Sequence, residues 1–307
     1  MLRFDTDKMK DLDPTSLQHL APLHGVLMGK EIVENWKEVE QFQARPDDVY
    51  ISTYPKAGTT WMSEIVDMIF CEGDQEKCRR EAIYNRVPYL ELRIPGSPSG
   101  VEQLQVAPSP RLVKTHLPIH LMPESIWDKN CKVIYVARNA KDVAVSYFFF
   151  HNMVKALPDP GPLDHFLNNY NKGNVSYGSW YDHVNGWWEK RQEYRILYLF
   201  YEDLKENPKR EILKVLHFLE KEMSDSLVDK IVQHTSFQEM KNNEMVNYKT
   251  IPNEFLDQSE TSFMRKGIAG DWKNHFTVAQ NEIFDEEYNR QMAGKNLHFR
   301  TEINVNI

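Results

Sequence analysis

The residues best suited to chemistry lie in one stretch, Val49 to Phe70. A short apolar run leads into the loop Lys56-Ala57-Gly58-Thr59-Thr60, and apolar residues from Trp61 onward then recur at helical spacing. This pattern predicts a strand, a phosphate-sized loop and a helix. Free N–H groups at a helix N-terminus, threonine hydroxyls and a nearby ammonium together form an anion site. The alternative is a structural glycine/threonine turn, because such turns are common before helices.

Three further clusters combine reactive or charged side chains with positions at strand ends or in loops. Lys114-Thr115-His116 closes one apolar run, Arg138 follows another, and Arg265-Lys266-Gly267 lies in a predicted loop. Ligands of parallel sheets bind at strand ends, arginine suits phosphate, and histidine can take a proton from a hydroxyl near neutral pH. Taken alone, a strand-end histidine is more often structural, and a single arginine is more often solvated or salt-bridged.

The elements that must position these residues alternate along the chain. Apolar strands are predicted near Val49–Ile51 and at 111–116, 132–137 and 195–201, and helices at 32–42, 140–154, 178–193, 208–220, 224–234 and 277–291. Such alternation predicts an α/β fold with a central parallel sheet flanked by helices. We expect residues 1–25 to be loosely ordered and 26–307 to form one domain. The Pro/Gly/Ser-rich stretch 94–110 is predicted to be a surface loop that covers the site.

Composition narrows the class of protein. The 307 residues carry a net charge of −8, with a pI near 5.8, which argues against a general nucleic-acid surface. The three cysteines, Cys71, Cys78 and Cys131, have neither zinc spacing nor an even disulfide count, so we expect reduced thiols. The N-terminus lacks a signal-peptide apolar region and no run is long enough to span a membrane, which predicts a cytoplasmic protein without membrane contact.

Five motifs, in the same order, resemble those of the cytosolic sulfotransferases. They are YPKAGTTW, KTHLP, ARNAKD, FYED and FMRKG, and the chain is most similar to the phenol/estrogen branch. Ala57 stands where the family has serine, which removes one hydroxyl from the loop. The resemblance implies transfer of a sulfuryl group from 3′-phosphoadenosine 5′-phosphosulfate (PAPS) to a hydroxyl of a phenolic xenobiotic, an estrogen or an iodothyronine. The co-product would be 3′,5′-phosphoadenosine.

The resemblance also implies roles for individual residues. His116 would be the general base, Lys56 and Lys114 would stabilise developing charge, and Ser146 would hold Lys56 away until acceptor is present. The implied PAPS contacts are Lys56, Ala57, Gly58, Thr59, Thr60, Trp61, Arg138, Ser146, Tyr201, Thr235, Ser236, Phe237, Gln238, Glu239, Met240, Phe263, Met264, Arg265, Lys266 and Gly267. The implied acceptor contacts are Lys114, Thr115, His116, Tyr89, Phe150, Tyr248 and Phe255. Aromatic residues at such acceptor positions are most often ordinary core.

Some residues depart from the family's pattern, and alternative functions remain open. Gly29, Ile32 and Leu92 stand where relatives often carry aromatics, which would widen the acceptor pocket. Lys273–Glu282 matches the family's short dimer motif, which implies a homodimer; the alternative is an ordinary helix start. No acidic cluster stands near the motifs, so no metal is expected. The alternatives are a P-loop-like nucleotide kinase or NTPase, disfavoured because Lys56 precedes the only loop glycine, and a non-catalytic carrier of hydrophobic phenols.

Overall fold

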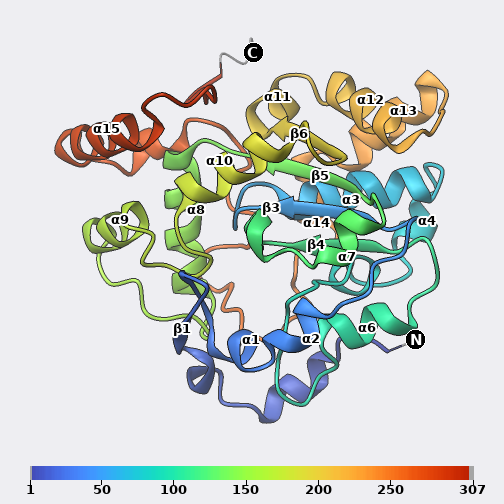
Figure 1. Ribbon diagram of the computed structural model, residues 1–307, viewed down its shortest axis with the longest axis horizontal. Coiled ribbons are helices and arrows are strands. Elements are labelled where there is room, and N and C mark those ends of the chain that lie inside the picture. Colours follow the sequence, from blue (N-terminus) through green and yellow to red (C-terminus); the bar gives the residue numbers. More distant parts are fainter. Residues whose placement is uncertain (1, 304–307) are drawn as a thin grey trace.

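A central sheet of four parallel strands organises the computed structural model, which describes residues 2–303 (Figure 1). The strands are β3 (Val49–Thr53), β4 (Leu112–Thr115), β5 (Lys132–Ala137) and β6 (Ile196–Phe200), in the order β4-β3-β5-β6. In the register of the sheet, Val49 of β3 pairs with Leu112 on one side and Lys132 on the other. The predicted parallel sheet is therefore confirmed.

The two faces of the sheet bury different residues of the same strands. Ile51 and Ile134 belong to the core shared with α3 (Thr59–Phe70), α12 (Pro208–Leu219) and α13 (Asp225–His234). Tyr50 and Tyr135 belong to the core shared with α8 (Ala140–Met153) and α10 (Trp180–Lys190). Successive side chains of a strand point to opposite faces, so helices on both faces explain why the strands are apolar throughout.

Most predicted helices are present with small shifts at their ends. Those expected at 140–154, 178–193, 208–220, 224–234 and 277–291 are α8, α10, α12, α13 and α15 (Val278–Met292). The other elements are η1 (Thr6–Asp11), η2 (Pro14–Leu17), β1 (Leu20–Leu23), β2 (Val26–Gly29), α1 (Lys30–Glu34), α2 (Trp36–Glu40), α4 (Gln75–Cys78), α5 (Ile83–Arg86), α6 (Gly100–Val106), η3 (Ile119–Leu121), α7 (Glu124–Asp128), α9 (Leu163–Asn171), α11 (Tyr201–Glu206), α14 (Phe237–Asn242) and η4 (Asp271–Asn274).

Two local expectations need correction. The helix expected over 32–42 is divided into α1 and α2, because Asn35 leaves helical geometry at ψ 15° and its side-chain amide donates to the Glu31 carbonyl. The stretch 94–110 is not all loop. It contains α6, which begins at a capping box in which Ser99 and Glu102 satisfy each other's backbone amides.

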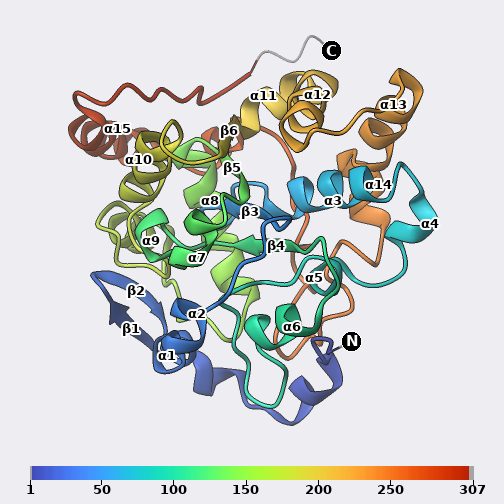
Figure 2. The ribbon, with the colours of Figure 1, turned by 45° about the vertical axis from the view of Figure 1, so that its right-hand side comes forward.

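The N-terminal segment, expected to be loosely ordered, contains η1, η2 and β1 in the structure. Phe4, Met9 and Leu17 are buried in a small apolar cluster with Phe255. These side chains are too widely spaced to give a periodic pattern, so their burial depends on distant partners. Both views show this segment and α15 at opposite ends of the molecule (Figures 1 and 2).

Candidate functional site

The carboxyl ends of the four strands meet at one edge of the sheet, and each is followed by a predicted site residue. Lys56 follows β3, His116 follows β4, Arg138 follows β5 and Tyr201 follows β6. All four side chains line one cavity of about 460 Å³, a volume within the range of small-molecule sites.

Most of the predicted site residues line this cavity. They are Tyr89, Lys114, His116, Lys56, Gly58, Thr59, Thr60, Trp61, Arg138, Ser146, Phe150, Tyr201, Thr235, Phe237, Met240, Tyr248, Phe255, Phe263, Met264, Arg265, Lys266 and Gly267. Five predicted residues do not line it: Ala57, Thr115, Ser236, Gln238 and Glu239. Ala57 and Thr115 are buried behind the walls, whereas Gln238 and Glu239 are exposed on α14.

The loop after β3 has the geometry of an anion site. Gly58 precedes α3 at φ 112°, and a Cβ at this position would lie 3.0 Å from the Tyr201 ring. Lys56 is also left-handed, at φ 69°, which is uncommon for a residue with a side chain. The Thr59 hydroxyl lies 2.6 Å from that of Thr53, which fixes the first turn of α3 to its strand. The first N–H groups of the twelve-residue α3, which have no partner within the helix, therefore lie at the cavity.

The ammonium group of Lys56 lies between two aromatic rings, 4.1 Å from the centre of Phe150 and 4.0 Å from that of Phe263. Removal from water, together with the charges of Arg138 and Arg265, lowers the pKa of Lys56 to about 7. Ser146 lines the same cavity, but no hydrogen bond joins it to Lys56 within residues 2–303. Aromatic faces rather than the Ser146 hydroxyl thus hold the lysine here.

Arg138 and Arg265 supply the positive wall of the cavity. The Arg138 guanidinium donates to the carbonyls of Lys56 at 3.2 Å and Ile268 at 3.0 Å, and Arg265 pairs with Asp271 at 2.6 Å. The Nε atoms of both arginines are buried and find no hydrogen-bond partner in the described part of the chain. Buried donors are normally satisfied, so these atoms indicate that an anionic ligand belongs here.

Two aromatic side chains adjoin this positive wall. Trp61 and Tyr201 meet edge to face, with ring centres 5.5 Å apart, and the buried indole N–H of Trp61 has no partner within residues 2–303. Lys205, which the sequence did not single out, also lines the cavity, and burial followed by the Arg138 charge lowers its pKa. Its spacing of four residues from Tyr201 on α11 was the available signal.

His116 is held so that one ring nitrogen faces the cavity. Its Nδ1 lies 2.8 Å from the Thr53 carbonyl oxygen, an acceptor that requires the proton on Nδ1. No hydrogen bond to Nε2 comes from residues 2–303, which leaves that nitrogen available as a base. Burial, partly opposed by the Thr53 hydrogen bond, lowers the pKa of His116 to about 3, so the imidazole is neutral at physiological pH.

The far end of the cavity is apolar and aromatic. Tyr89, Phe150, Tyr248 and Phe255, which the resemblance implied as acceptor contacts, line the cavity, and Lys114 donates to the Tyr248 hydroxyl at 3.1 Å. The N-terminal residues Phe4, Met9 and Leu17 also line this end, together with Leu92 and with Ile94, the first residue of the stretch expected to cover the site. The burial of the N-terminal segment therefore closes the apolar end.

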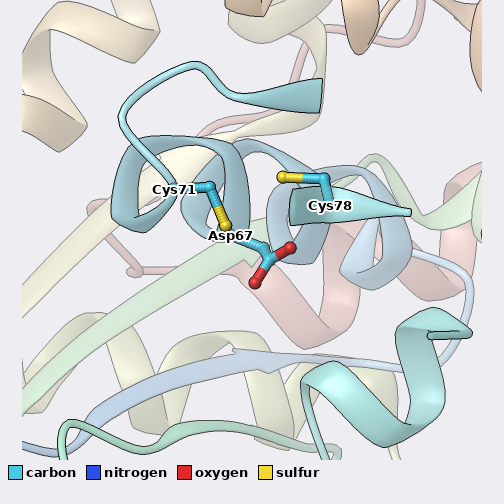
Figure 3. Close-up of side chains that lie close together, drawn as sticks. All are labelled: Asp67, Cys71 and Cys78. Atoms are coloured by element: carbon cyan, nitrogen blue, oxygen red, sulfur yellow. The ribbon is translucent and has the colours of Figure 1, made fainter. Parts of the chain in front are cut away.

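A separate cluster brings Asp67, Cys71 and Cys78 together, with ligand atoms within 4.8 Å of one another (Figure 3). Cys71 and Cys78 are free thiols, and Asp67 is paired with both Arg80 and Arg86. The guanidinium groups of Arg80 and Arg86 both pair with Asp67, the carboxylate of this cluster, and would repel a metal cation. The cluster is therefore a structural ion-pair site. It lies at the far end of α3 from the cavity.

The sequence and structure comparisons define the class of protein. The sulfotransferase domain family matches residues 46–296, and the chain belongs to this family. Among curated relatives, rat sulfotransferase 1 family member D1 is 59% identical over 93% of this chain and 97% of its own length. Human sulfotransferase 1E1 is 57% identical over 92% and 96%, and dog sulfotransferase 1A1 is 55% identical over 96% and 100%.

Solved structures agree with this assignment. Mouse sulfotransferase SULT7A1, crystallised with PAP, is 33% identical, with a TM-score of 0.74 and coverage of 90% of this chain and 95% of that one. A retinol dehydratase structure is 24% identical, with a TM-score of 0.85 and coverage of 96% and 95%, and shows the shared fold. The protein is thus a sulfotransferase, and neither the nucleotide-kinase nor the carrier alternative gains support. No helix in residues 2–303 is long and apolar enough to cross a membrane.

Proposed function

We propose that this sulfotransferase uses PAPS to sulfate the hydroxyl of a small apolar acceptor, most suitably a phenol such as a phenolic xenobiotic, an estrogen or an iodothyronine. The observation that carries the proposal is the opening of His116 Nε2 and Lys56 onto one cavity, positive at one end and aromatic at the other. The solved mouse relative was crystallised with PAP, the abbreviation for 3′,5′-phosphoadenosine, which supports the choice of nucleotide.

The positive end fits a nucleotide that carries two phosphate positions. The α3 N-terminus and the Lys56–Thr60 loop would hold the 5′-phosphosulfate, whereas Arg138 and the Arg265–Gly267 loop would hold the 3′-phosphate. Gly267, at φ 64°, packs so closely against Phe237 that a Cβ would lie 2.1 Å from its ring. Trp61 and Tyr201 would border the adenine. When bound, PAPS supplies a sulfuryl group joined to phosphate in an anhydride, and that phosphate is a good leaving group.

His116 would take the proton of the acceptor hydroxyl on Nε2. The acceptor oxygen then forms a bond to sulfur as the bond between sulfur and the phosphate oxygen breaks, and the electron pair leaves with that phosphate. The neutral imidazole and the Nδ1–H fixed by Thr53 give Nε2 the required lone pair. Positioned general bases contribute about 10²–10⁴-fold to rate.

Lys56 and Lys114 would stabilise the charge that moves onto the departing phosphate oxygens. Lys56 opens onto the cavity beside the loop, and Lys114 enters from β4, two residues before His116. Both would act as positive groups in an enclosed site, where their effect exceeds that in water. Ser146 lies on the same wall and would become a partner for Lys56 as the lysine moves off its aromatic rings. We propose that no metal takes part.

An aromatic acceptor end favours planar phenols over polar or charged acceptors. Gly29 borders the cavity, and a Cβ there would meet only the Ile32 Cδ1 at 3.9 Å, so space is open beside this residue. A transfer assay with PAPS and a panel of phenols, estrogens, iodothyronines and amines tests the proposal directly. Absence of transfer to every phenol would contradict it, as would stronger thermal protection by ATP with magnesium than by 3′,5′-phosphoadenosine.

We also propose a cytoplasmic homodimer formed through Lys273–Glu282. Val278 and Ile283, at the start of α15, are exposed by 76% and 66%, the largest exposures among the big apolar residues described. Two large apolar side chains this exposed within one short segment support an association surface there. The capping box of Thr277 and Gln280 fixes the helix start that presents them.

A further inference from the structure

A buried carboxylate that no sequence motif contains lies directly behind His116. Glu91 is 1% exposed, and its two oxygens are divided between consecutive residues at the end of β4. One oxygen accepts from the His116 backbone N–H at 2.7 Å, and the other accepts from the Thr115 hydroxyl at 2.8 Å. Thr115 Oγ1 in turn accepts from the Leu117 N–H at 3.0 Å. Glu91 therefore fastens three successive residues around the proposed base.

The backbone beside Glu91 explains how its side chain reaches this place. Tyr89 forms a parallel bridge with Lys114, and the Leu90 N–H donates to the Lys114 carbonyl at 2.9 Å. Residues 88–90 thus run along the free edge of β4 and deliver Glu91 to the carboxyl end of that strand. Across residues 2–303 Glu91 has no ion-pair partner, which is unusual for a carboxylate this deeply buried.

The other backbone and ring atoms of His116, apart from Nε2, also have hydrogen-bond partners. The His183 ring donates to the His116 carbonyl at 3.0 Å, and the Thr53 carbonyl takes the Nδ1 proton. Edge-to-face contacts with Tyr89 and Tyr177 enclose the imidazole, with ring centres 5.1 and 5.4 Å away. The hydroxyls of these two tyrosines are 2.7 Å apart. Glu91 thus holds the backbone of a residue whose ring is itself enclosed by two tyrosines.

We propose that Glu91 is a positioning residue for the transfer step: it holds His116 through the backbone amide so that Nε2 meets the acceptor hydroxyl. This inference rests on the proposed role of His116 as base. Burial raises the pKa of Glu91 to about 7, against the opposing hydrogen bonds from His116 and Thr115. Burying this carboxyl group is costly because it loses contact with water, and its hydrogen-bond partners lie at the proposed base. Both features are typical of a supporting residue at a functional site.

The test compares Glu91→Ala and Glu91→Gln with the parent, using two acceptors that differ in their need for a base. An unsubstituted phenol is neutral and must lose its proton, whereas a nitrophenol above its own pKa is already ionised. With the neutral phenol we expect Glu91→Ala to lower kcat by about 10–100-fold, because a small misplacement of the base is costly. With the ionised nitrophenol the loss should shrink to about threefold or less, and KM for PAPS should stay within the same margin.

Glu91→Gln should recover most of kcat, since an amide of the same length can accept from the His116 N–H and donate to Thr115 Oγ1. Glu91→Asp keeps the charge but shortens the reach, and should repeat the selective loss if Glu91→Ala does not fold. Glu211→Gln, which changes a buried carboxylate on α12, is the matched control. It should change kcat by the same factor with both acceptors.

Equal losses with both acceptors would make Glu91 merely structural, and a Glu91→Gln variant as slow as Glu91→Ala would assign its effect to charge. Either result overturns the proposal. Failure of the parent to transfer to either phenol would instead overturn the proposed function, so the two failures are distinguishable.

Discussion

The ammonium nitrogen of Lys56 lies 4.0 Å from the centre of the Phe263 ring, so the loop lysine contacts a residue more than 200 positions later in the chain. A ring face attracts the cation but gives it no hydrogen bond, and Arg138 and Arg265 repel it. The lysine therefore lies in an environment that stabilises its neutral form relative to water. A bound phosphate would instead stabilise the charged form of Lys56.

This relationship predicts a pH dependence of nucleotide binding. The pKa of Lys56 is about 7 in the empty protein, and a bound anion raises it. Binding above that pH must then take up a proton, so affinity for 3′,5′-phosphoadenosine should fall by up to about tenfold per pH unit as pH rises. Calorimetry in buffers of different ionisation enthalpy measures the uptake. Lys56→Met should abolish it, and a proton release by the parent would contradict the prediction.

Replacing His116 by alanine should remove most turnover while leaving nucleotide binding nearly intact. His116 contacts the Thr53 carbonyl and the two tyrosine rings but belongs to the acceptor side of the cavity. We expect kcat with a neutral phenol to fall by about 10²–10⁴-fold. Titration with 3′,5′-phosphoadenosine provides the control. A loss of affinity equal to the loss of rate would show that His116 supports the fold instead.

Replacing Arg138 by alanine should weaken PAPS far more than adenosine 5′-phosphosulfate, which lacks the 3′-phosphate. The buried Arg138 Nε is free to donate to a phosphate, and a charged hydrogen bond contributes about 1.5–3 kcal/mol. Arg138 also bridges the Lys56 and Ile268 carbonyls, so some loss common to both nucleotides is expected. Competition binding measures both affinities. Identical losses would exclude a specific 3′-phosphate contact.

Filling the space beside Gly29 should alter acceptor choice. Gly29 precedes α1 at φ −55°, a conformation open to any residue, so Gly29→Phe should fold without backbone strain. The added ring should lower kcat/KM for an estrogen more than for simple phenol, because only the larger acceptor needs that volume. Gly29→Ala is the conservative comparison. Equal effects on both acceptors would show that Gly29 does not border the bound acceptor.

Among the residues that line the cavity, the sequence predicted best those that directly follow strands. Parallel strands bring their carboxyl ends together whatever their order, so Lys56, His116 and Arg138 had to converge. Contiguous motifs were a weaker guide. Of Thr235–Met240, only Thr235, Phe237 and Met240 line the cavity, since α14 turns Gln238 and Glu239 to solvent.

The partners of His116 could not be found from spacing. Glu91, Thr53 and His183 lie 25, 63 and 67 positions away, and they meet it through sheet register and helix packing. The burial of Phe4, Met9 and Leu17 depends in the same way on Phe255, at the other end of the chain. Local patterns record which residues are apolar, whereas these contacts depend on the assembled fold.

Replacing Val278 by glutamate should convert a dimer to a monomer with turnover preserved. The sequence left open whether Val278 belongs to the core of its helix, but its 76% exposure shows that it does not, so a charge there should not unfold the chain. In a two-fold interface the substitution appears twice, and the two carboxylates would repel. Sedimentation should show half the mass, and Val278→Ala is the matched control for lost apolar area alone. A parent that is monomeric at high concentration, or a glutamate variant that stays dimeric, would rule out this surface as the interface.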